Sequence, residues 1–403
     1  MSNNAQPEIR FPGFTEGWEQ HKLIEVARYR NGKAHEQAID ESGKYIVVNS
    51  KFVSTNGRVK KYTNIIIDPL KKNELAFVLS DVPNGKAIAR TFLVDKEHRY
   101  SLNQRIAGIT PHKDTDSYFL NVLMNRNPYF LKFDNGVGQT NLTKADVENF
   151  IGHYPSYEEQ QKIGTFFKQL DDTIALHQRK LDLLKETKKG FLQKMFPKNG
   201  AKVPEIRFPG FTEDWEERKL NEGMTEYTDR VYIQDDEIYK QVSVKNVGEI
   251  TLRGEQIGSK IGRKRQAKVN LIEHPDTLIF TRQTIEQGGI GFAPKETDGA
   301  IVTENMPTID VDNDIINCNY LLAYVKTEDW YRKVILKNIE GGTAQIAIHE
   351  DSILFSEVLI PKIEEQQKIG AFFKQLDDTI TLHQRKLDLL KETKKGFLQK
   401  MFV

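Results

Sequence analysis

The sequence predicts an α+β protein of two pseudo-symmetric halves, each a mixed α/β domain followed by a long helix, with the two helices packed as an antiparallel coiled coil. Two repeats support this prediction. The 39 residues Glu158–Phe196 recur at Glu364–Phe402 with only two differences, and Pro7–Leu23 recurs at Pro204–Leu220. The sequences between the repeats share little. Similar frames around divergent inserts indicate one scaffold that carries two different domains.

Each copy of the longer repeat is expected to form a helix, because its apolar residues alternate at spacings of four and three. A helix of this length would span roughly 58 Å, which favours a spacer role. Two similar halves would form a self-complementary contact, and such a contact requires the helices to run antiparallel. The apolar seam of the first copy holds Ile163, Phe167, Leu170, Ile174, Leu181, Leu184, Phe191 and Met195. Two seam positions are polar, His177 and Lys188, and whether they meet the other helix or reach solvent stays open.

The apolar face of this helix is wider than a two-stranded coil requires. Phe166, Leu176, Leu183 and Leu192 lie beside the seam. These side chains either dock helices of a partner or face the core of their own domain. The residues expected at the helix–helix and subunit interface are Ile163, Phe166, Phe167, Leu170, Ile174, Leu181 and Leu184, with Ile369, Phe372, Phe373, Leu376, Ile380, Leu387 and Leu390 in the second copy.

Two glycines, Gly164 and Gly190, lie inside the predicted helix. A glycine in a helix interior costs about 1 kcal/mol relative to alanine. The helix is therefore expected to begin near residue 165 and to end near residue 189.

The repeats also place the domain boundaries. We expect a first domain at 1–155, a first helix at 156–197, a linker at 198–203, a second domain at 204–360 and a second helix at 361–403. Short β-branched runs predict strands at Lys44–Val48, Asn64–Ile67, Glu74–Leu79, Tyr239–Val244, Thr277–Phe280 and Ala300–Thr303. Short helices are expected at Tyr118–Asn125 and Asn319–Thr327. Trp18 and Trp215 are expected in the cores, and so are Leu142 and Ile348, which follow glycine turns at 136–139 and 341–345.

The composition indicates a soluble, cytoplasmic protein. Hydrophobic residues make up 38% of the chain, and no apolar run approaches the length of about 18 that a membrane span needs, so neither a span nor a signal peptide is expected. The single cysteine, Cys318, excludes an internal disulfide framework and a cysteine-based zinc cluster. The 58 basic and 57 acidic residues give a net charge of +1. A nucleic-acid partner would therefore require a local positive field or one supplied by other subunits.

Motifs for catalysis are weak. Gly288-Gly289-Ile290-Gly291 lacks the spacing of a dinucleotide fingerprint, and the sequence has no P-loop. Asn127-Pro128-Tyr129-Phe130 is similar to the Asn-Pro-Pro-Tyr motif of amino-methyltransferases but lacks its second proline, so a turn is the favoured interpretation. The nine histidines show no metal-ligand spacing. We therefore predict no catalytic residue and no metal site in this chain.

Basic residues and amides on loops are the better functional signal. Lysines and arginines near Gly57 and after Gly258 suit phosphate neutralisation, and a solvated charged loop is the alternative. Arginine and amide side chains that follow strands suit the reading of base edges. The candidates are Lys51, Arg58, Lys60, Lys61, Asn84, Arg90, Asn103, Gln104 and Arg105 in the first half, and Lys260, Arg263, Lys264, Arg265, Lys268, Arg282, Gln283 and Asn305 in the second.

The duplicated EEQQKIG…LDDTI…LHQRKLDLLKETKKGFLQKMF helices, the PGFTEGW and PGFTEDW segments and the glycine-glutamine turns together resemble the specificity (S) subunit of type I restriction-modification systems. The resemblance covers essentially the full chain, and the paired helices carry it. It implies two target-recognition domains, each of which reads one half of a split, asymmetric DNA site. It also implies two antiparallel helices that hold these domains apart, and no catalytic activity in this chain.

The same resemblance implies partners. Two methyltransferase subunits, which bind S-adenosylmethionine and methylate adenine, and restriction subunits, which use ATP and Mg, are expected to join this chain on double-stranded DNA. No cofactor is expected on the chain itself. Two alternatives stay open. A coiled-coil scaffold whose variable domains bind proteins would show no site-specific DNA retention, and a methyltransferase that uses the Asn127–Phe130 turn would bind S-adenosylmethionine as an isolated chain.

Overall fold

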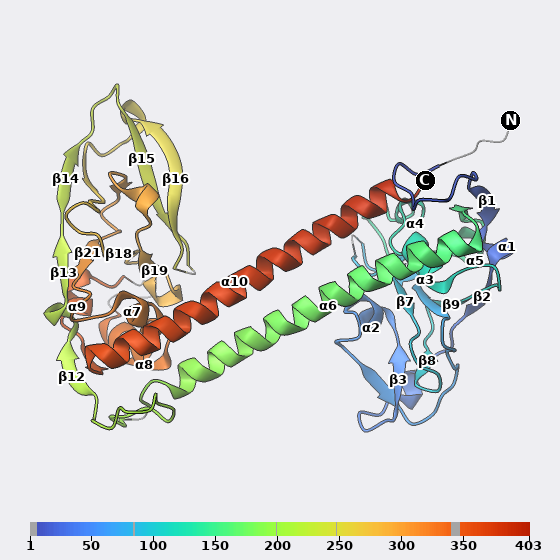
Figure 1. The fold of residues 1–403 in the computed structure, drawn as a ribbon, viewed down its shortest axis with the longest axis horizontal. Coiled ribbons are helices and arrows are strands. Elements are labelled where there is room, and N and C mark those ends of the chain that lie inside the picture. The colour runs from blue at the N-terminus through green and yellow to red at the C-terminus, as the bar shows by residue number, and fades with distance from the viewer. Residues whose placement is uncertain (1–5, 84, 199, 247, 340–346) are drawn as a thin grey trace. The chain divides into compact units, whose positions relative to one another are not determined.

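The computed structural model describes residues 6–83, 85–198, 200–246, 248–339 and 347–403, and the chain divides into two compact units (Figure 1). The first unit comprises Met1–Gln178 and Arg385–Val403, and the second comprises Arg179–Gln384. Each unit therefore holds one α/β domain, the beginning of one long helix and the end of the other.

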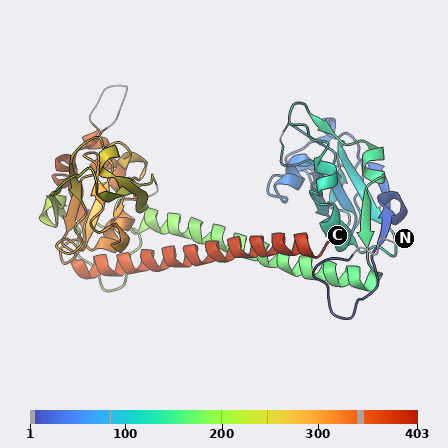
Figure 2. The ribbon, with the colours of Figure 1, turned by 90° about the horizontal axis from the view of Figure 1, so that it is seen from above.

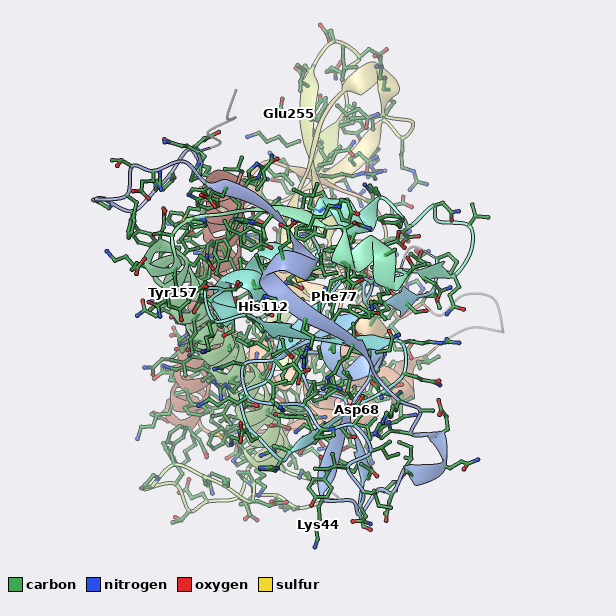
Figure 3. All side chains as sticks on the ribbon, turned by 90° about the vertical axis from the view of Figure 1, so that its right-hand side faces the viewer. Lys44, Asp68, Phe77, His112, Tyr157 and Glu255 are labelled. Atoms are coloured by element: carbon green, nitrogen blue, oxygen red, sulfur yellow. The ribbon has the colours of Figure 1, made fainter. Side chains whose placement is uncertain are left out.

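The first unit is built on two sheets. Four antiparallel strands in the order β2 (Ala27–Asn31), β9 (Ile106–Pro111), β5 (Leu75–Val78) and β7 (Thr91–Leu93) form the larger one. The smaller sheet has the order β4 (Lys61–Thr63), β3 (Tyr45–Val48) and β8 (Tyr100–Leu102), with β3 and β8 parallel. Phe77 of β5 lies inside this unit, whereas Lys44 projects from its surface (Figure 3).

Shorter elements complete the first unit. Two-stranded sheets pair β1 (Glu19–Lys22) with β11 (Ile151–Tyr154) and β6 (Ser80–Asp81) with β10 (Thr140–Asn141). The helices are α1 (Leu23–Val26), α2 (Ser50–Ser54), α3 (Ser117–Met124), α4 (Pro128–Leu131) and α5 (Lys144–Glu148), with the 3-10 helix η1 (Glu36–Ala38).

The second unit repeats this plan and enlarges it. Its four-stranded sheet has the order β13 (Met224–Tyr227), β21 (Thr308–Val311), β18 (Thr277–Phe280) and β19 (Ile290–Phe292). A second sheet has the order β14 (Asp229–Tyr232), β17 (Arg265–Lys268), β20 (Ile301–Val302), β15 (Ile238–Val244) and β16 (Ile250–Ile257). β12 (Glu216–Lys219) pairs with β22 (Glu357–Ile360).

Apart from its parts of the two long helices described below, the second unit has only short helices among the residues described. They are α7 (Cys318–Tyr324), α8 (Glu328–Trp330), a π-helical turn η6 (Tyr331–Ile335) and α9 (Glu350–Leu354). The 3-10 turns are η2 (Leu220–Glu222), η3 (Gly258–Lys260), η4 (Ile285–Gln287), η5 (Lys295–Thr297) and η7 (Leu336–Asn338).

The two domains share one topology. The order β13-β21-β18-β19 matches β2-β9-β5-β7, and β16-β15-β20 matches β4-β3-β8, including the parallel pairing of its last two strands. The second unit adds β14 and β17 beyond β20. The predicted pseudo-symmetric α+β plan is therefore confirmed, and the additional strands account for part of the divergence between the inserts.

The long helices are α6 (Tyr157–Lys194) and α10 (Ile363–Lys400). In the first unit Phe166, near the start of α6, contacts Phe397, near the end of α10, with ring centroids 4.9 Å apart. The equivalent pair in the second unit, Phe191 and Phe372, lies at 5.0 Å. In each unit, therefore, the beginning of one helix packs against the end of the other, which confirms the antiparallel arrangement.

Ion pairs flank these aromatic contacts. Lys394 pairs with Asp171 in the first unit, and Lys188 pairs with Asp377 in the second. The two pairs are equivalent under the 206-residue offset between the helices. Lys188 therefore meets the other helix, which settles the question that the sequence left open for this residue.

The helices pass through Gly164 and Gly190 without interruption, so the shorter helix expected from glycine propensity is wrong. The start of α6 packs closely on the cap of α3, and an added Cβ at Gly164 would lie 3.1 Å from the backbone nitrogen of Phe119. The close approach of α3 requires glycine at this position, and its contacts outweigh the local propensity.

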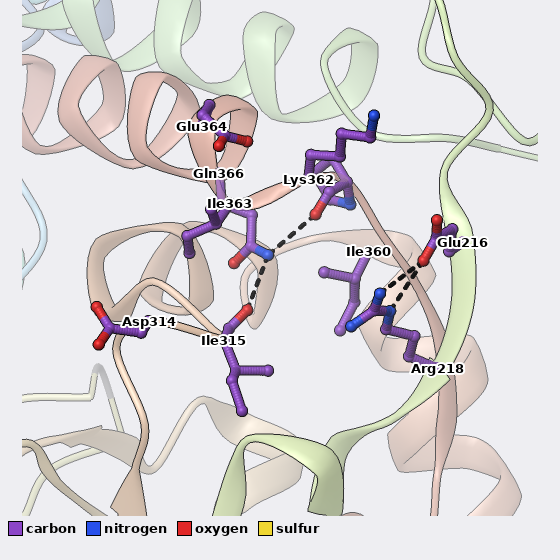
Figure 4. Close-up of a pocket in the computed structure, with 10 residues that line it drawn as sticks. Glu216, Arg218, Asp314, Ile315, Ile360, Lys362, Ile363, Glu364 and Gln366 are labelled. Carbon is purple, nitrogen blue, oxygen red and sulfur yellow. Dashed lines mark hydrogen bonds and ion pairs between the residues drawn. The ribbon is translucent and has the colours of Figure 1, made fainter.

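A buried glutamine fixes the start of each long helix. Gln366 Nε2 donates to the backbone oxygens of Ile315 at 3.1 Å and Pro361 at 3.0 Å. Figure 4 marks the bond between Gln366 and Ile315. The equivalent Gln160 Nε2 donates to Pro155 O at 3.0 Å. Both glutamines are nearly inaccessible to solvent. Each therefore satisfies carbonyl groups at the junction between its domain and its helix.

The ends of the long helices complete the cores. Phe402, which follows α10, packs on Trp18 and Phe119 of the first unit, and the C-terminal end of α10 lies beside that domain (Figures 1 and 2). Phe196, which follows α6, packs on Trp215 and on the rings of α7 in the second unit. Trp18 and Trp215 are each 2% exposed, so their predicted core positions are confirmed.

Most of the predicted short elements are confirmed within one or two residues, including the cores at Leu142 and Ile348. The strand expected at Asn64–Ile67 is wrong. The strand β4 ends at Thr63, whose Oγ1 accepts a hydrogen bond from Ile65 N at 3.2 Å and donates to Ile65 O at 3.1 Å. These local side-chain bonds replace a ladder and turn the chain into a loop. The glycine turn at 341–345 lies outside the described residues.

Every residue expected at the helix interface is buried or half-buried. The structure divides them, however. Ile163 and Phe167 belong to the core of their own domain, as do Ile369 and Phe373 in the second unit. Beside the seam, Phe166 and Leu192 also pack on domain cores, whereas Leu176 and Leu183 are 60% and 63% exposed.

Candidate nucleic-acid interface

Loops of the first domain gather at one edge of its four-stranded sheet. The loop between β5 and β7 meets the loop between β8 and β9, because Leu79 N donates to Arg105 O at 3.0 Å. The segment that includes β10 joins them through Leu142 N, which donates to Leu79 O at 2.8 Å, and through Gln139 Nε2, which donates to Ser80 Oγ at 2.7 Å. We call these three segments the first loop cluster.

The second domain has an equivalent arrangement. Arg282 N, in the loop between β18 and β19, donates to Asn305 O at 3.0 Å, and Asn305 lies between β20 and β21. Ile348 N donates to Arg282 O at 3.0 Å. These three segments form the second loop cluster, held by the same two backbone hydrogen bonds as the first.

The backbone of the first loop cluster is strained. Ala89 and Arg105 adopt left-handed conformations with φ of 57° and 63°, and Arg126, in the adjacent turn after α3, has φ of 57°. Arg126 N donates to Ala89 O at 2.8 Å, which ties two of these residues together. Non-glycine residues in this conformation cost on the order of 1 kcal/mol or more each and cluster at functional sites.

Two arginines meet at this loop, which also holds the Asp81 carboxylate, the acceptor of hydrogen bonds from Ala87 N and Ile88 N. Arg90 Nε donates to Lys86 O at 2.5 Å, and Arg126 Nη1 donates to the oxygens of Gly85 and Ile88 at 3.4 Å each. Burial, together with the charge of Arg126, lowers the pKa of Arg90. The two positive charges exceed the charge of Asp81, so the loop suits an anionic partner.

The structure brings together most of the remaining candidates of the first half. Asn103, Gln104 and Arg105 share the loop between β8 and β9, and Gln104 Nε2 donates to Glu36. Asn103 N donates to Val48 O, which brings the loop next to α2 and Lys51. Arg58, Lys60 and Lys61 are exposed on the chain that follows α2, and Asn84 lies outside the described residues.

The basic cluster predicted in the second half is partly neutralised. Arg263 pairs with Glu304, Lys264 with Asp235, and Lys268 with Asp229 at 3.4 Å. Lys260 and Arg265 have no ion-pair partner within the described ranges. The positive field of this segment is therefore weaker than the residue count suggests.

A groove of about 520 Å³ runs between the two sheets of the second domain. Its walls carry Arg230, Arg263, Arg265 and Arg282, with Glu226 and Glu304 as the acidic members. The groove thus unites part of the basic cluster with Arg282 of the second loop cluster. Gln283 and Asn305 are exposed beside Arg282.

Sequence reasoning missed two residues of these surfaces. Arg230 lies on β14, which pairs with β17, the strand that carries Arg265. In this pairing Arg265 lies opposite the exposed Tyr232 of β14. The pairing of the two strands therefore places Arg230 in the same groove as Arg265. Arg126 reaches the first loop cluster through a left-handed turn after α3. The Asn125-Arg126-Asn127-Pro128 run is a turn signal that could have indicated Arg126, whereas the pairing of β14 with β17 has no comparable local signal.

Metal and membrane chemistry have no counterpart in the described part of the chain. Across the ranges given above, three or more His, Cys, Asp or Glu side chains nowhere come together as a metal site. No helix among the described residues is long and apolar enough to cross a membrane.

A family model and two similar proteins point to the same family. The family described as type I restriction modification DNA specificity domain matches the chain twice, at residues 15–186 and 200–392. The specificity subunit of the type I restriction enzyme MjaVIII of Methanocaldococcus jannaschii is 23% identical over 398 residues, which cover 95% of this chain and 91% of that protein. The putative MjaX specificity subunit of the same organism is 20% identical over 407 residues, covering 95% and 92%.

Among solved structures, the S subunit of a type I restriction-modification system from M. genitalium has a TM-score of 0.68 at 14% identity, over 99% of both chains. This likeness shows a common fold. The family match covers most of both halves. The chain therefore belongs to the type I restriction-modification specificity family and is a non-catalytic DNA-recognition subunit with two recognition domains.

Proposed function

We propose that each recognition domain reads its half of a split DNA site through its loop cluster. The observation that carries the proposal is the equivalence of the two clusters. Leu79 and Arg282 make the same pair of backbone hydrogen bonds to neighbouring segments, although the loops around them differ in sequence. A common frame with divergent side chains is what two readers of different half-sites require.

The basic candidates have a separate role in this proposal. Lys51, Arg58, Lys60 and Lys61 in the first domain, with Lys260 and Arg265 in the second, contact phosphates and set the register of each domain on the duplex. Phosphate contacts weaken binding uniformly when they are removed, whereas base contacts change the preferred sequence. The two classes of residue can therefore be told apart by experiment.

Exchange of residues 221–357 for the matching segment of a relative tests the division of labour. The half-site read by the second domain should change, and the other half should stay the same, as measured by sequencing DNA retained by the assembled complex. A change in both halves, or in neither, would contradict the proposal.

We further propose that the chain assembles with two methyltransferase subunits and with restriction subunits. S-adenosylmethionine would bind to the methyltransferase, and ATP and Mg to the restriction subunit. Support for docking comes from leucines that are 60–67% exposed on the long helices, namely Leu176 and Leu389 in the first unit and Leu183 and Leu382 in the second. Exposed apolar side chains repeated in this way are typical of a protein interface.

Leu176→Ser combined with Leu389→Ser should reduce co-purification of the methyltransferase subunit while thermal unfolding of the chain stays unchanged. Lys180→Ser, an exposed substitution on the same helix, is the matched control. Equal recovery of the partner with the leucine variant and with the control would contradict docking at these leucines.

A further inference from the structure

Arg282 of the second loop cluster is fixed through both its side chain and its backbone. Its Nε donates to Glu350 Oε2 at 2.7 Å, and its Nη2 donates to Glu350 Oε1. The backbone bonds to Asn305 and Ile348 hold the other end of the residue. Bidentate contacts between arginine and a carboxylate set the orientation of the guanidinium plane.

The contact with Glu350 occupies only one edge of the guanidinium. An arginine offers five N–H donors in a planar fork, and Nε with Nη2 form its side edge. The end edge is formed by Nη1 and by the second N–H of Nη2. Nη1 has no hydrogen-bond partner among the residues that the structure describes, and Glu350 engages only the N–H of Nη2 that lies beside Nε. Because Arg282 lines the groove of the second domain, this edge is available to a ligand there.

Two other arginines show how a purely structural pair differs. Arg10 binds Glu159 and Arg207 binds Glu365 through the same two nitrogens, but each joins an opening loop to the start of a long helix. Nη1 of Arg10 is buried and has no hydrogen-bond partner among the described residues. Arg282, by contrast, lines an open groove, and its side chain is slightly more exposed, at 20% against 12% for Arg10 and 15% for Arg207.

The charges around Arg282 keep it in place at neutral pH. Burial alone would raise the pKa of Glu350. The hydrogen bonds and charge of Arg282 outweigh this effect, so the pKa of Glu350 is lower than its usual value. Glu226, across the groove, has its pKa raised by burial and by the Glu350 and Asp351 carboxylates. Glu350 is therefore the ionised partner that orients Arg282.

We propose that Arg282, oriented by Glu350, reads a guanine in the half-site of the second domain. The end edge of arginine matches the O6 and N7 acceptors that guanine presents in the major groove, whereas adenine places a donor at the position of O6. The same edge can also bind a phosphate, and the two contacts differ in their consequence. Loss of a guanine contact changes the preferred sequence, whereas loss of a phosphate contact weakens binding to all sequences. This inference rests on the proposed role of the second loop cluster and adds to it a base and a residue.

The test is selection from a random DNA library by the full chain assembled with its partner subunits. The wild-type complex should select guanine at one position of the second half-site. Arg282→Gln should lower that preference by roughly 5- to 150-fold while the first half-site stays unchanged. Glu350→Gln should weaken the same preference to a smaller extent, because Arg282 remains but is held less firmly.

Arg282→Gln alone leaves Glu350, which is 12% exposed, without its partner and could destabilise the domain. The double variant Arg282→Gln, Glu350→Gln removes both charges and retains two groups that can hydrogen bond, so it keeps the test informative. Thermal unfolding of each variant shows that the domain is folded. Arg207→Lys is the matched control, with lower stability expected and an unchanged sequence preference.

An unchanged guanine preference in the folded double variant would overturn the inference, and so would an equal loss of affinity for all sequences, which is the signature of a phosphate contact. In either case the wild-type complex still selects a second half-site, so the proposed role of the loops survives. A wild-type complex whose second domain selects no sequence would overturn both.

Discussion

Glu159 Oε1 and Oε2 accept hydrogen bonds from Arg10 Nε and Nη2 at 2.8 and 2.7 Å across 149 residues of sequence. Arg207 and Glu365 reproduce this pair in the second unit at 2.7 and 2.8 Å. The hydrogen bonds from Arg10 to Glu159 raise the pKa of the arginine. Each pair joins the opening repeat of a half to the first turn of its long helix, so the two repeated sequences form one structural joint.

Glu159→Gln should therefore lower the stability of the first unit. Glu159 is fully buried and Arg10 is 12% exposed, and removal of one partner from a buried pair typically costs about 3–5 kcal/mol. Urea unfolding measures the loss of stability, and hydrogen exchange of the native protein in β1 and β11 locates it in the first unit. Glu216→Gln, which breaks an exposed pair with Arg218, is the control and should cost less than about 1 kcal/mol. Equal effects of the two substitutions would contradict this account.

Gly164 and Gly190 should respond in opposite directions to alanine. Alanine is favoured over glycine by about 1 kcal/mol in a helix interior, and at Gly190 an added Cβ meets nothing within 4 Å. Gly190→Ala should therefore raise the free energy of unfolding. Gly164→Ala should lower it, because the new methyl group collides with the cap of α3 at Asp116 and Phe119. Thermal unfolding of both variants is the measurement, and stabilisation by Gly164→Ala would show that α3 can move aside.

These glycines also show where sequence-based prediction succeeds. The long helices, their antiparallel direction and the repeated plan could be predicted, because apolar spacing along a duplicated segment records the packing directly. The helix limits could not, because Gly164 is explained by the approach of α3, which lies far away in sequence. Propensity is a local quantity, and tertiary contacts override it.

The candidate site was predicted only in part. Arg282 and Asn305 stood out because they follow predicted strands, and Arg105 because it is a forked donor on a predicted loop. The backbone hydrogen bonds of the loop clusters do bring such residues together. Arg230 was missed because it lines the groove only through the pairing of β14 with β17. The carboxylates that neutralise Arg263 and Lys264 were missed for the same reason, since Glu304 and Asp235 come from distant segments.

The two ion pairs between the long helices should differ in strength. Asp171 faces Lys394 and accepts from Tyr118 Oη at 2.9 Å, whereas Asp377 pairs with Lys188 and lies 3.8 Å from Lys326. Burial and the charge of Lys188 already lower the pKa of Lys326. Asp377→Asn leaves two neighbouring lysines without their shared carboxylate.

Asp377→Asn should consequently destabilise its unit more than Asp171→Asn destabilises the other. The coupling between Lys188 and Asp377 in a double-mutant cycle should be about 0.5–1 kcal/mol, since Asp377 is 43% exposed. Urea unfolding of Lys188→Met, Asp377→Asn and the double variant gives the coupling. Strict additivity would show that the pair does not stabilise the helix contact.

The last residues of the chain should stabilise the domain encoded first. Phe402 packs on Trp18 and Phe119, with ring centroids 6.2 and 5.5 Å away. Phe402→Ala should destabilise the first unit by about 2 kcal/mol, which is less than the full cost of a buried phenylalanine because the ring is half-buried. Phe196→Ala, at a site 2% exposed, should destabilise the second unit by about 3–5 kcal/mol.

Hydrogen exchange separates these two effects. Phe402→Ala should accelerate exchange in β2 and β9, and Phe196→Ala should accelerate it in β13 and β21. Val403→Ala, at an exposed position, is the control for changes at the chain end. Faster exchange in the second unit upon Phe402→Ala, with the first unit unaffected, would refute the assignment of the C-terminal segment.

Alkylation of the Cys318 thiol should be slow in the native protein and should proceed at the ordinary rate of a cysteine after unfolding. Burial, together with the Asp276 carboxylate, raises the pKa of this thiol to about 12. An unperturbed cysteine has a pKa of about 8.5, and only the thiolate is alkylated. Alkylation at pH 8.5 should therefore be roughly three orders of magnitude slower in native protein than in urea, and it should rise about tenfold per pH unit between pH 8.5 and 10.5.

Because Cys318 is the single cysteine, its alkylation reports on the second unit alone. Asp276→Asn removes one cause of the raised pKa and should accelerate the native reaction, while the rate in urea stays the same. Mass spectrometry after timed exposure to iodoacetamide gives both rates. A native rate equal to the rate in urea at pH 8.5 would mean that the thiol is neither buried nor influenced by Asp276, and the packing at the start of α7 would then differ from that described.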